Sequence, residues 1–362
     1  MKYVDEFRAP GAVGPLISEI ARVLGGRKAS LMEVCGTHTV AIFRSGLAKL
    51  LPPGIRLLSG PGCPVCVTSN SYIDRAIALA RLKDATVVTF GDMFRVPGST
   101  SSLEKEKAQG ADVRMVYSPI DSLGIAERKP ERNVVFLGVG FETTTPAVAA
   151  TILEARRRGL RNFFVLCGHK VVPPALQALA SDRDLGIDGF ILPGHVSTIL
   201  GSRPYEFLAK ERRLPCVIAG FEPVDVAQAV LMLARQLAEG RADVEIQYRR
   251  SVRPEGNPKA LAVMDQVLRP CDSTWRGIGL IPGSGLELRP DYSDFDARRI
   301  PVTVEPERTE KGCICGAILR GVKSPKECPL FGTVCTPEEP VGACMVSSEG
   351  TCAAHHRYAR ED

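Results

Sequence analysis

The sequence has no apolar run long enough to cross a lipid bilayer. Its longest uninterrupted apolar stretches, such as residues 134–141, fall far short of the ~18 residues that a membrane-spanning helix requires. Residues 1–8 carry charges where a signal peptide would need an apolar run. We therefore expect a cytoplasmic protein that does not insert into a membrane.

A strong imbalance of charge is also missing. The 362 residues include 46 Lys and Arg against 41 Asp and Glu, which gives a formal net charge of +5. An excess this mild, spread along the chain, argues against nucleic acid or an anionic membrane as a partner. Glycine and proline, 34 and 27 residues, together stay below the roughly 25–30% that marks low-complexity disorder. The composition predicts a folded globular protein.

The sequence contains no complete nucleotide-binding motif. Gly138-Val-Gly140 follows an apolar run but lacks the third glycine of a dinucleotide fingerprint. A Gly-x-x-x-x-Gly-Lys-Ser/Thr loop does not occur anywhere in the chain. A mechanism driven by nucleotide therefore has no motif to support it.

Cysteine, by contrast, is abundant, with twelve residues. Because the cytosol keeps thiols reduced, structural disulfides are a poor explanation for so many cysteines. Metal binding or redox chemistry becomes their expected role.

Short apolar runs alternate with segments of helical period between residue 30 and about residue 240. This alternation is typical of β-α-β units on a parallel sheet, so we predict an α/β fold. The predicted strands are residues 31–34, 55–58, 85–90, 113–117, 133–137, 163–166, 189–192 and 216–219.

The eight predicted strands form two sets of four at a nearly constant offset. Val34 aligns with Val139 and Gly62 with Gly168, at separations of 105 and 106 residues. We interpret the offset as an internal duplication. It predicts two similar parallel-sheet domains at residues 1–130 and 131–245, followed by a cysteine-rich domain at residues 246–362. The alternative is a chance register, because any two α/β folds can be slid into alignment.

Cys35 directly follows the first predicted strand, in the motif Cys35-Gly-Thr-His38-Thr. Ligands of open α/β sheets bind at the carboxyl ends of the strands, where helices begin. A thiol at a helix N-terminus is expected to have a lowered pKa, and His38 could lower it further, so Cys35 is a candidate nucleophile or metal ligand. In the alternative interpretation, Cys35 is a small buried apolar residue and His38 a hydrogen-bonding residue at the helix start.

Cys63 and Cys66 form a Cys-x-x-Cys motif between the second predicted strand and the next helix. This is the thioredoxin-type arrangement, in which the two sulfurs can form a reversible disulfide. The pair could instead be half of a zinc site, but zinc needs a second closely spaced pair and the tail has no Cys-x-x-Cys. Redox chemistry or iron is therefore favoured over zinc.

Half of the cysteines lie within forty residues of the C-terminal region, among prolines and glycines that prevent long regular elements. Such a segment has little to order it unless a metal binds. Four thiolates are the usual ligands of a 4Fe-4S cluster, which would leave two of the six over. The six are Cys313, Cys315, Cys328, Cys335, Cys344 and Cys352.

Three further polar residues follow predicted strands: Asp92, Glu142 and His195. Taken alone, each is better explained as a hydrogen-bonded loop residue than as a catalyst. The strand-end loops of the two sheets should nevertheless form a cleft in which these three side chains converge with Cys35 and His38.

Together, five motifs resemble the HypD family of hydrogenase maturation factors over essentially the whole chain. They are Cys35-Gly-Thr-His38-Thr, Gly60-Pro-Gly-Cys63-Pro-Val-Cys66-Val-Thr, Gly140-Phe-Glu142-Thr-Thr, Pro193-Gly-His195-Val-Ser and Cys344-Met-Val-Ser-Ser-Glu-Gly-Thr-Cys352.

The resemblance implies two α/β domains and a third domain that carries a 4Fe-4S cluster. It also implies a scaffold, rather than an enzyme that turns over free substrate, on which the Fe(CN)2CO unit of nickel-iron hydrogenases is assembled. The implied partners are a HypC-like small protein that shares the iron and a HypE-like cyanide donor. Cys35 would bind the transient iron that carries cyanide and carbon monoxide, and Cys63 and Cys66 would form a redox pair nearby.

The resemblance also implies a set of cluster ligands. The family pattern Cys-x12-Cys-x6-Cys-x16-Cys matches Cys315, Cys328, Cys335 and Cys352, although Cys344 could replace the last and Cys313 the first. The competing hypotheses are a disulfide reductase that depends on the cluster and acts through Cys63 and Cys66, and a structural zinc protein.

Overall fold

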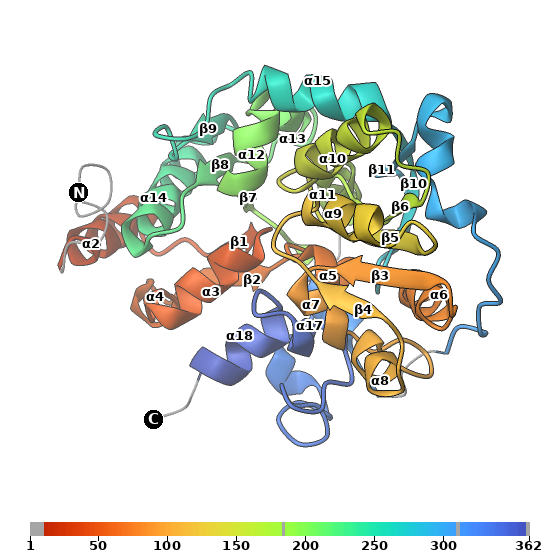
Figure 1. The fold of residues 1–362 in the computed structure, drawn as a ribbon. Coiled ribbons are helices and arrows are strands. Elements are labelled where there is room, and N and C mark those ends of the chain that lie inside the picture. Colours follow the sequence, from red (N-terminus) through yellow and green to blue (C-terminus); the bar gives the residue numbers. More distant parts are fainter. Residues whose placement is uncertain (1–10, 183–184, 309–311, 360–362) are drawn as a thin grey trace.

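Two parallel β-sheets form the centre of the protein in a computed structural model, which describes residues 11–182, 185–308 and 312–359 (Figure 1). All eight predicted strands are present. The five-stranded sheet has the order β2 (Ile55–Ser59), β1 (Ala29–Glu33), β7 (Gly189–Pro193), β8 (Cys216–Ala219), β9 (Val244–Ile246). The four-stranded sheet has the order β4 (Val113–Met115), β3 (Ala85–Thr89), β5 (Asn133–Gly138), β6 (Phe163–Cys167).

Each sheet draws strands from both halves of the chain. In the five-stranded sheet β1 pairs with β7, and in the four-stranded sheet β3 pairs with β5. The chain crosses to the second sheet after β2 and returns to the first after β6. A boundary near residue 130 therefore does not separate the two sheets, and the predicted division into 1–130 and 131–245 needs this correction.

The strand order supports the internal repeat itself. With the offset found in the sequence, β1, β2, β3 and β4 correspond to β5, β6, β7 and β8. The four-stranded sheet has the order β4-β3-β5-β6. Replacing each strand by its counterpart gives β8-β7-β1-β2. This is the order of the same four strands in the five-stranded sheet, counted from β8 to β2. The two halves thus exchange strand pairs, and each sheet combines the first pair of one half with the second pair of the other.

Helices cover the faces of the sheets, so the central strands are buried on both sides, and β3, β7 and β8 have no exposed residue. The helices of the first half are α2 (Val13–Leu24), α3 (Gly36–Arg44), α4 (Leu47–Leu50), α5 (Pro64–Val67), α6 (Asn70–Ala80), α7 (Gly91–Arg95), α8 (Leu103–Ala108) and α9 (Asp121–Arg128). Those of the second half are α10 (Thr145–Arg157), α11 (Val172–Ser181), α12 (Gly194–Leu200), α13 (Glu206–Lys210), α14 (Pro223–Glu239) and α15 (Pro258–Val267).

Local sequence explains where α14 begins and ends. Glu222 and Asp225 form a reciprocal capping box, and Pro223 occupies the first helical position, where its missing N–H costs no hydrogen bond. Gly240 ends the helix with a φ of 66°, a left-handed conformation that favours glycine. The helix packs against α2 on one face of the five-stranded sheet.

An antiparallel hairpin, β10 (Leu268–Trp275) and β11 (Gly279–Leu288), follows α15 and was not predicted. It packs against both sheet regions, because Trp275 pairs with Thr68 and Gly285 with Lys170. The Trp275 ring is buried, and its Nε1 donates to Ser284 Oγ at 2.8 Å.

The tail contains only short helices: η5 (Pro325–Glu327), α16 (Cys315–Leu319), α17 (Ala343–Val346) and α18 (Thr351–Tyr358). It lies against the first half of the chain, where α18 contacts α3 and α17 contacts α5 (Figure 1). None of the helices in the described ranges has both the length and the apolar character needed to span a membrane.

Candidate functional site

Cys35 lies where β1 ends and α3 begins, as predicted. It is the N-cap residue of α3, with extended backbone angles (φ −150°, ψ 121°). Its main-chain N–H donates to the buried carboxylate of Glu33, at 3.1 Å from Oε2, and Oε1 of the same carboxylate accepts from Thr39 Oγ1 at 2.5 Å. Burial raises the pKa of Glu33 to about 8. This carboxyl group therefore fixes the loop that presents the thiol.

The thiol of Cys35 does not have the lowered pKa that its position predicted. Burial raises the pKa of Cys35 to about 12, and the negative charges of Glu349 and Glu33 add to the effect. Hydrogen bonds from the start of α3 act in the opposite direction but are weaker. The prediction failed because it weighed the helix terminus and not the loss of water around a side chain that is only 8% exposed.

The ring of His38 is held at the end of β8, two strands away from β1 in the same sheet. Its Nε2 lies 2.9 Å from the carbonyl oxygen of Gly220 and 3.3 Å from that of Ala219, so Nε2 carries the proton and donates. The ring stacks on Phe221 with 4.7 Å between centroids. Burial lowers the pKa of His38 to about 4. A neutral imidazole cannot lower the pKa of Cys35 through positive charge, which corrects the role expected of it.

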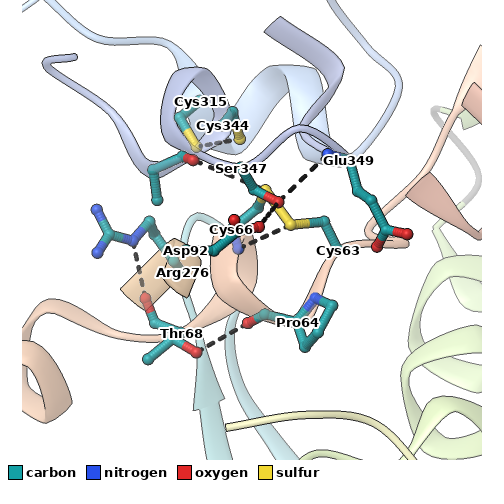
Figure 2. Close-up of a disulfide and its surroundings, with 11 residues drawn as sticks. Cys63, Pro64, Cys66, Thr68, Asp92, Arg276, Cys315, Cys344, Ser347 and Glu349 are labelled. Atoms are coloured by element: carbon teal, nitrogen blue, oxygen red, sulfur yellow. Dashed lines mark hydrogen bonds between the residues drawn. A yellow bond between two sulfur atoms is a disulfide. The ribbon is translucent and has the colours of Figure 1, made fainter. Parts of the chain in front are cut away.

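Cys63 and Cys66 are joined by a disulfide, with their Cα atoms 5.3 Å apart (Figure 2). Cys63 is the N-cap residue of α5, and its sulfur accepts the main-chain N–H of Cys66 at 3.2 Å. Both are buried, with exposures of 3% and 0%. The structure thus brings the two sulfurs together as predicted, and their cycling between disulfide and dithiol stays a prediction.

The loops carrying Cys35 and the disulfide are in direct contact. The Gly36 N–H donates to the carbonyl oxygen of Gly62 at 3.0 Å. A Cβ atom on Gly62 would lie 2.3 Å from the nitrogen of Cys35, so only glycine fits at this position. The motifs after β1 and β2 therefore pack directly against each other in the interior of the protein.

The six tail cysteines surround one small cavity, whose other walls are largely apolar. The sulfurs of Cys315 and Cys344 lie 3.1 Å apart. The cavity is lined by Cys313, Cys315, Ile318, Cys328, Leu330, Phe331, Cys335, Gly342, Cys344, Met345 and Cys352. Within the described ranges, no three His, Cys, Asp or Glu side chains converge closely enough to hold a single metal ion.

The tail cavity adjoins the disulfide (Figure 2). The sulfur of Cys66 lies 3.9 Å from the carbonyl oxygen of Ala343, the residue before Cys344. Contacts between α17 and α5 maintain this approach. Three sulfur sites thus follow one another in space: Cys35, the Cys63–Cys66 disulfide and the tail cysteines.

Asp92 contacts the tail instead of standing free in a cleft. The buried hydroxyl of Ser347 donates to Asp92 Oδ2 at 2.7 Å and accepts the N–H of Glu349 at 3.3 Å. The side chain of Glu349 in turn accepts from Thr37 Oγ1 at 2.7 Å. The segment between Cys344 and Cys352 is therefore tied to both α7 and α3.

Glu142 is fully buried in the loop between β5 and α10. Its Oε1 accepts the N–H of Val172 at 2.9 Å, and its Oε2 has no hydrogen-bond partner among the described residues. Burial raises the pKa of Glu142 to about 7. Burial also raises the pKa of the Tyr205 phenol, and the negative charges of Glu142 and Cys35 raise it further.

His195 stands apart from the sulfur sites, on the outer side of Phe221. Its exposed ring stacks on Phe221 at 3.8 Å, so two histidines sandwich one phenyl ring. Burial of part of the ring lowers the pKa of His195. The structure therefore relates His195 to His38 through Phe221.

Sequence reasoning missed several residues of this region. Glu33 could have been noticed, because a carboxylate inside a predicted buried strand needs a partner. Phe221, Tyr205 and Glu349 are ordinary residues in the sequence, and only the fold shows where they lie. Arg276 lies in the turn of the unpredicted hairpin, where its Nε donates to the carbonyl oxygen of Thr68 at 2.8 Å.

Comparison with known proteins agrees with the motifs over the whole chain. The sequence model of HypD, described as the Hydrogenase formation hypA family, matches residues 12–359. The chain is 50% identical to the hydrogenase maturation factor HypD of Rhizobium leguminosarum bv. viciae over 374 residues, covering 99% of this chain and 96% of that protein. It is 44% identical to HypD of Escherichia coli (strain K12), covering 100% of this chain and 99% of that protein. The chain therefore belongs to the HypD family of hydrogenase maturation factors.

Proposed function

We propose that this maturation factor is the scaffold on which the Fe(CN)2CO unit of nickel-iron hydrogenases is assembled. In this proposal it acts with a HypC-like protein that shares the iron and a HypE-like protein that donates cyanide. The observation that carries the proposal is the unbroken series of sulfur sites from Cys35 through the Cys63–Cys66 disulfide to the tail cavity. Soft thiolates are suited to low-spin iron that carries the strong-field ligands cyanide and carbon monoxide. A redox-active disulfide beside this iron suits a cargo whose assembly requires reduction.

The donor set of the tail fits a 4Fe-4S cluster. Sulfur ligands around an apolar cavity are typical of such clusters, and the spread of the six thiols suits a cluster better than one ion. We propose Cys315, Cys328, Cys335 and Cys352 as ligands. Cys313 and Cys344 line the same cavity and are the alternatives at the two ends of the set. When bound, a 4Fe-4S cluster supplies electrons one at a time.

Cys35 is the proposed protein ligand of the iron cargo. Burial raises the pKa of Cys35, so the thiol would keep its proton until a metal displaces it. One thiolate leaves iron coordination incomplete, and a cysteine of the HypC-like partner would supply the second. The hydrogen bonds from Cys35 and Thr39 to Glu33 keep the loop in place before iron arrives.

The burial of the disulfide argues against the alternative function, a reductase that acts on protein disulfides. Such a reductase must expose its attacking sulfur to a large substrate, and Cys63 is only 3% exposed. A disulfide at this depth can take up two electrons and two protons to become a dithiol. We propose that this disulfide–dithiol couple stores two electrons for the assembly of the neighbouring iron cargo.

Replacement of Cys35 by Ala tests the scaffold proposal. The complex of Cys35→Ala with its HypC-like partner should lack the infrared bands of iron-bound cyanide and carbon monoxide, while the visible absorption of the tail cluster stays. Cys271→Ala is the matched control, since Cys271 is a half-buried thiol on the β10–β11 hairpin and should leave the bands unchanged. Bands of normal intensity in Cys35→Ala would show that the iron is held elsewhere.

Two further measurements separate the competing hypotheses. Anaerobically purified protein should contain about four iron atoms per chain, whereas zinc without iron would support a structural zinc protein. Thiol labelling with and without reductant should differ by two cysteines, and Cys63→Ala/Cys66→Ala should abolish the difference. Equal labelling under all redox conditions would mean that the pair does not cycle.

A further inference from the structure

Arg276 links the hairpin turn to the helix that carries the disulfide (Figure 2). Its main-chain N–H donates to the carbonyl oxygen of Val67 and its Nε to that of Thr68, both at 2.8 Å. These acceptors directly follow Cys66 in the chain. Arg276 therefore holds the C-terminal end of α5 in place from outside the sheet.

The same turn also lies against the start of the tail. A Cβ atom on Gly277 would lie 2.2 Å from the Cα atom of Gly316, so the two backbones are in close contact. Gly316 follows Cys315. The turn that carries Arg276 therefore packs directly against the residue that follows the first proposed cluster ligand.

The guanidinium of Arg276 lacks an anionic partner in the described part of the chain. Its acceptors are carbonyl oxygens, and its Nη2 is buried without any hydrogen-bond partner. Arg276 as a whole is half-buried, and a cation partly removed from water without a counter-charge destabilises a folded protein. A group of negative charge is therefore expected beside it, and ionised cysteines of the tail would supply that charge.

We propose that Arg276 is a positioning residue of the sulfur centre, whose guanidinium ties the disulfide helix to the tail and balances the negative charge of the loaded tail cysteines. This inference rests on the proposed function, because it takes a 4Fe-4S cluster as the resident group. The net charge around a cluster is one of the factors that set its reduction potential. A cation at Arg276 favours the more negative, reduced form.

Substitutions that separate charge from hydrogen bonding test the role of Arg276. In Arg276→Met the equilibrium constant for reduction of the cluster should fall about tenfold, equivalent to about 59 mV for one electron. Arg276→Lys retains the charge and should stay within about twofold of the wild type. The measurement is a redox titration of the visible absorption at constant pH. Arg269→Met is the matched control, because Arg269 is an exposed arginine of the same hairpin paired with Glu287 at 2.7 Å.

A second readout needs no cluster. In iron-free protein, both Arg276→Met and Arg276→Lys should speed hydrogen exchange at the amides of α5 and Thr68, because each removes the Nε bond to Thr68. Arg269→Met should not. Unchanged exchange in both Arg276 variants would show that the guanidinium does not hold this helix.

The outcomes distinguish this inference from the proposed function. Wild-type protein that binds no iron-sulfur cluster overturns the proposed function. A loaded wild type with the same potential in Arg276→Met overturns the charge-balancing role alone. If Arg276→Met does not load a cluster, the variants Arg276→Gln and Arg276→Lys are compared. A cluster in Arg276→Lys but not in Arg276→Gln would support the need for a positive charge. Absence of a cluster in Arg276→Lys would contradict that need.

Discussion

The two sheets and the cysteine-rich tail are ordered by different means. The central strands of the sheets are mainly apolar and buried on both faces, so hydrophobic packing can hold them. The tail has helices of three to eight residues, and six cysteines around a cavity occupy its centre. Elements this short gain little from packing. The difference suggests that the sheets form a preassembled support, whereas order in the tail depends on what its cysteines bind.

Loss of one proposed cluster ligand should show the difference between the two regions most strongly. Cys335→Ala should abolish the visible absorption of the proposed cluster and make residues 312–359 sensitive to protease, because a bound cluster would contribute folding free energy to the tail. The sheets should retain their circular dichroism and cooperative unfolding. Cys271→Ala should leave the cluster and the tail unchanged. A protease-resistant tail in Cys335→Ala would contradict the dependence on metal.

The sheets could be predicted from the sequence because their signals are local. Every predicted strand lies within a residue or two of an observed one, since an apolar run that ends in glycine or proline specifies a buried strand by itself. The exchange of strand pairs could not be predicted, because it depends on pairing between the two halves, 48 residues apart for Ala85 with Asn133 and 158 for Leu31 with Gly189. The hairpin was missed for a different reason: β10 is buried only at its two end residues, so it has no apolar run, and it contains Pro270.

The positions of the site residues could be predicted from the sequence, but their pKa values and hydrogen-bond partners could not. Cys35, Cys63, Cys66 and the tail cysteines could be placed because strand ends and cysteine spacing are visible in a sequence. The pKa of Cys35 and the orientation of His38 depend on burial and on carbonyl groups of a distant loop, which a sequence does not display. Asp92 likewise contacts Ser347, a partner 255 residues away along the chain.

A methyl group on Gly62 should damage the contact between the loops after β1 and β2. In Gly62→Ala the new Cβ would lie 2.3 Å from Cys35 N and 2.6 Å from the carbonyl carbon of Val34, and neither backbone can move easily. We expect a loss of about 3 kcal/mol in the free energy of unfolding, measured with urea. Gly14→Ala is the matched control: Gly14 lies exposed in α2 with open space around it, and alanine should stabilise by about 1 kcal/mol.

The buried carboxyl group of Glu142 should make stability depend on pH. Its pKa is raised from 4.5 to about 7, so the folded state binds the proton more tightly than the unfolded state. The resulting stability is fully present below pH 4.5 and is lost as pH rises through 7, by up to about 3 kcal/mol. Glu142→Gln should therefore gain stability relative to the wild type as pH rises from 5 to 8, in urea unfolding at each pH. Glu131→Gln, at an exposed position, is the control and should show the same dependence of stability on pH as the wild type. If the stability of Glu142→Gln also changed with pH in the same way as that of the wild type, the raised pKa of Glu142 would be contradicted.

The smallest expected effect concerns the hydroxyl that joins the tail to the sheet region. Ser347→Ala removes the bond to Asp92 Oδ2 and the acceptor for the Glu349 N–H, so two polar groups lose their partner in a buried place. The loss should be about 1–2 kcal/mol. Ser348→Ala is the matched control, because Ser348 is exposed and its removal should cost almost nothing.

The decisive observation is which region of the protein loses stability in Ser347→Ala. If the tail is held to the sheets by such local contacts as well as by its cysteines, hydrogen exchange in Ser347→Ala should accelerate in α17 and α18 and not in β3 or β5. Acceleration spread evenly over both regions would show that tail and sheets unfold as one unit, and the distinction between them would not hold.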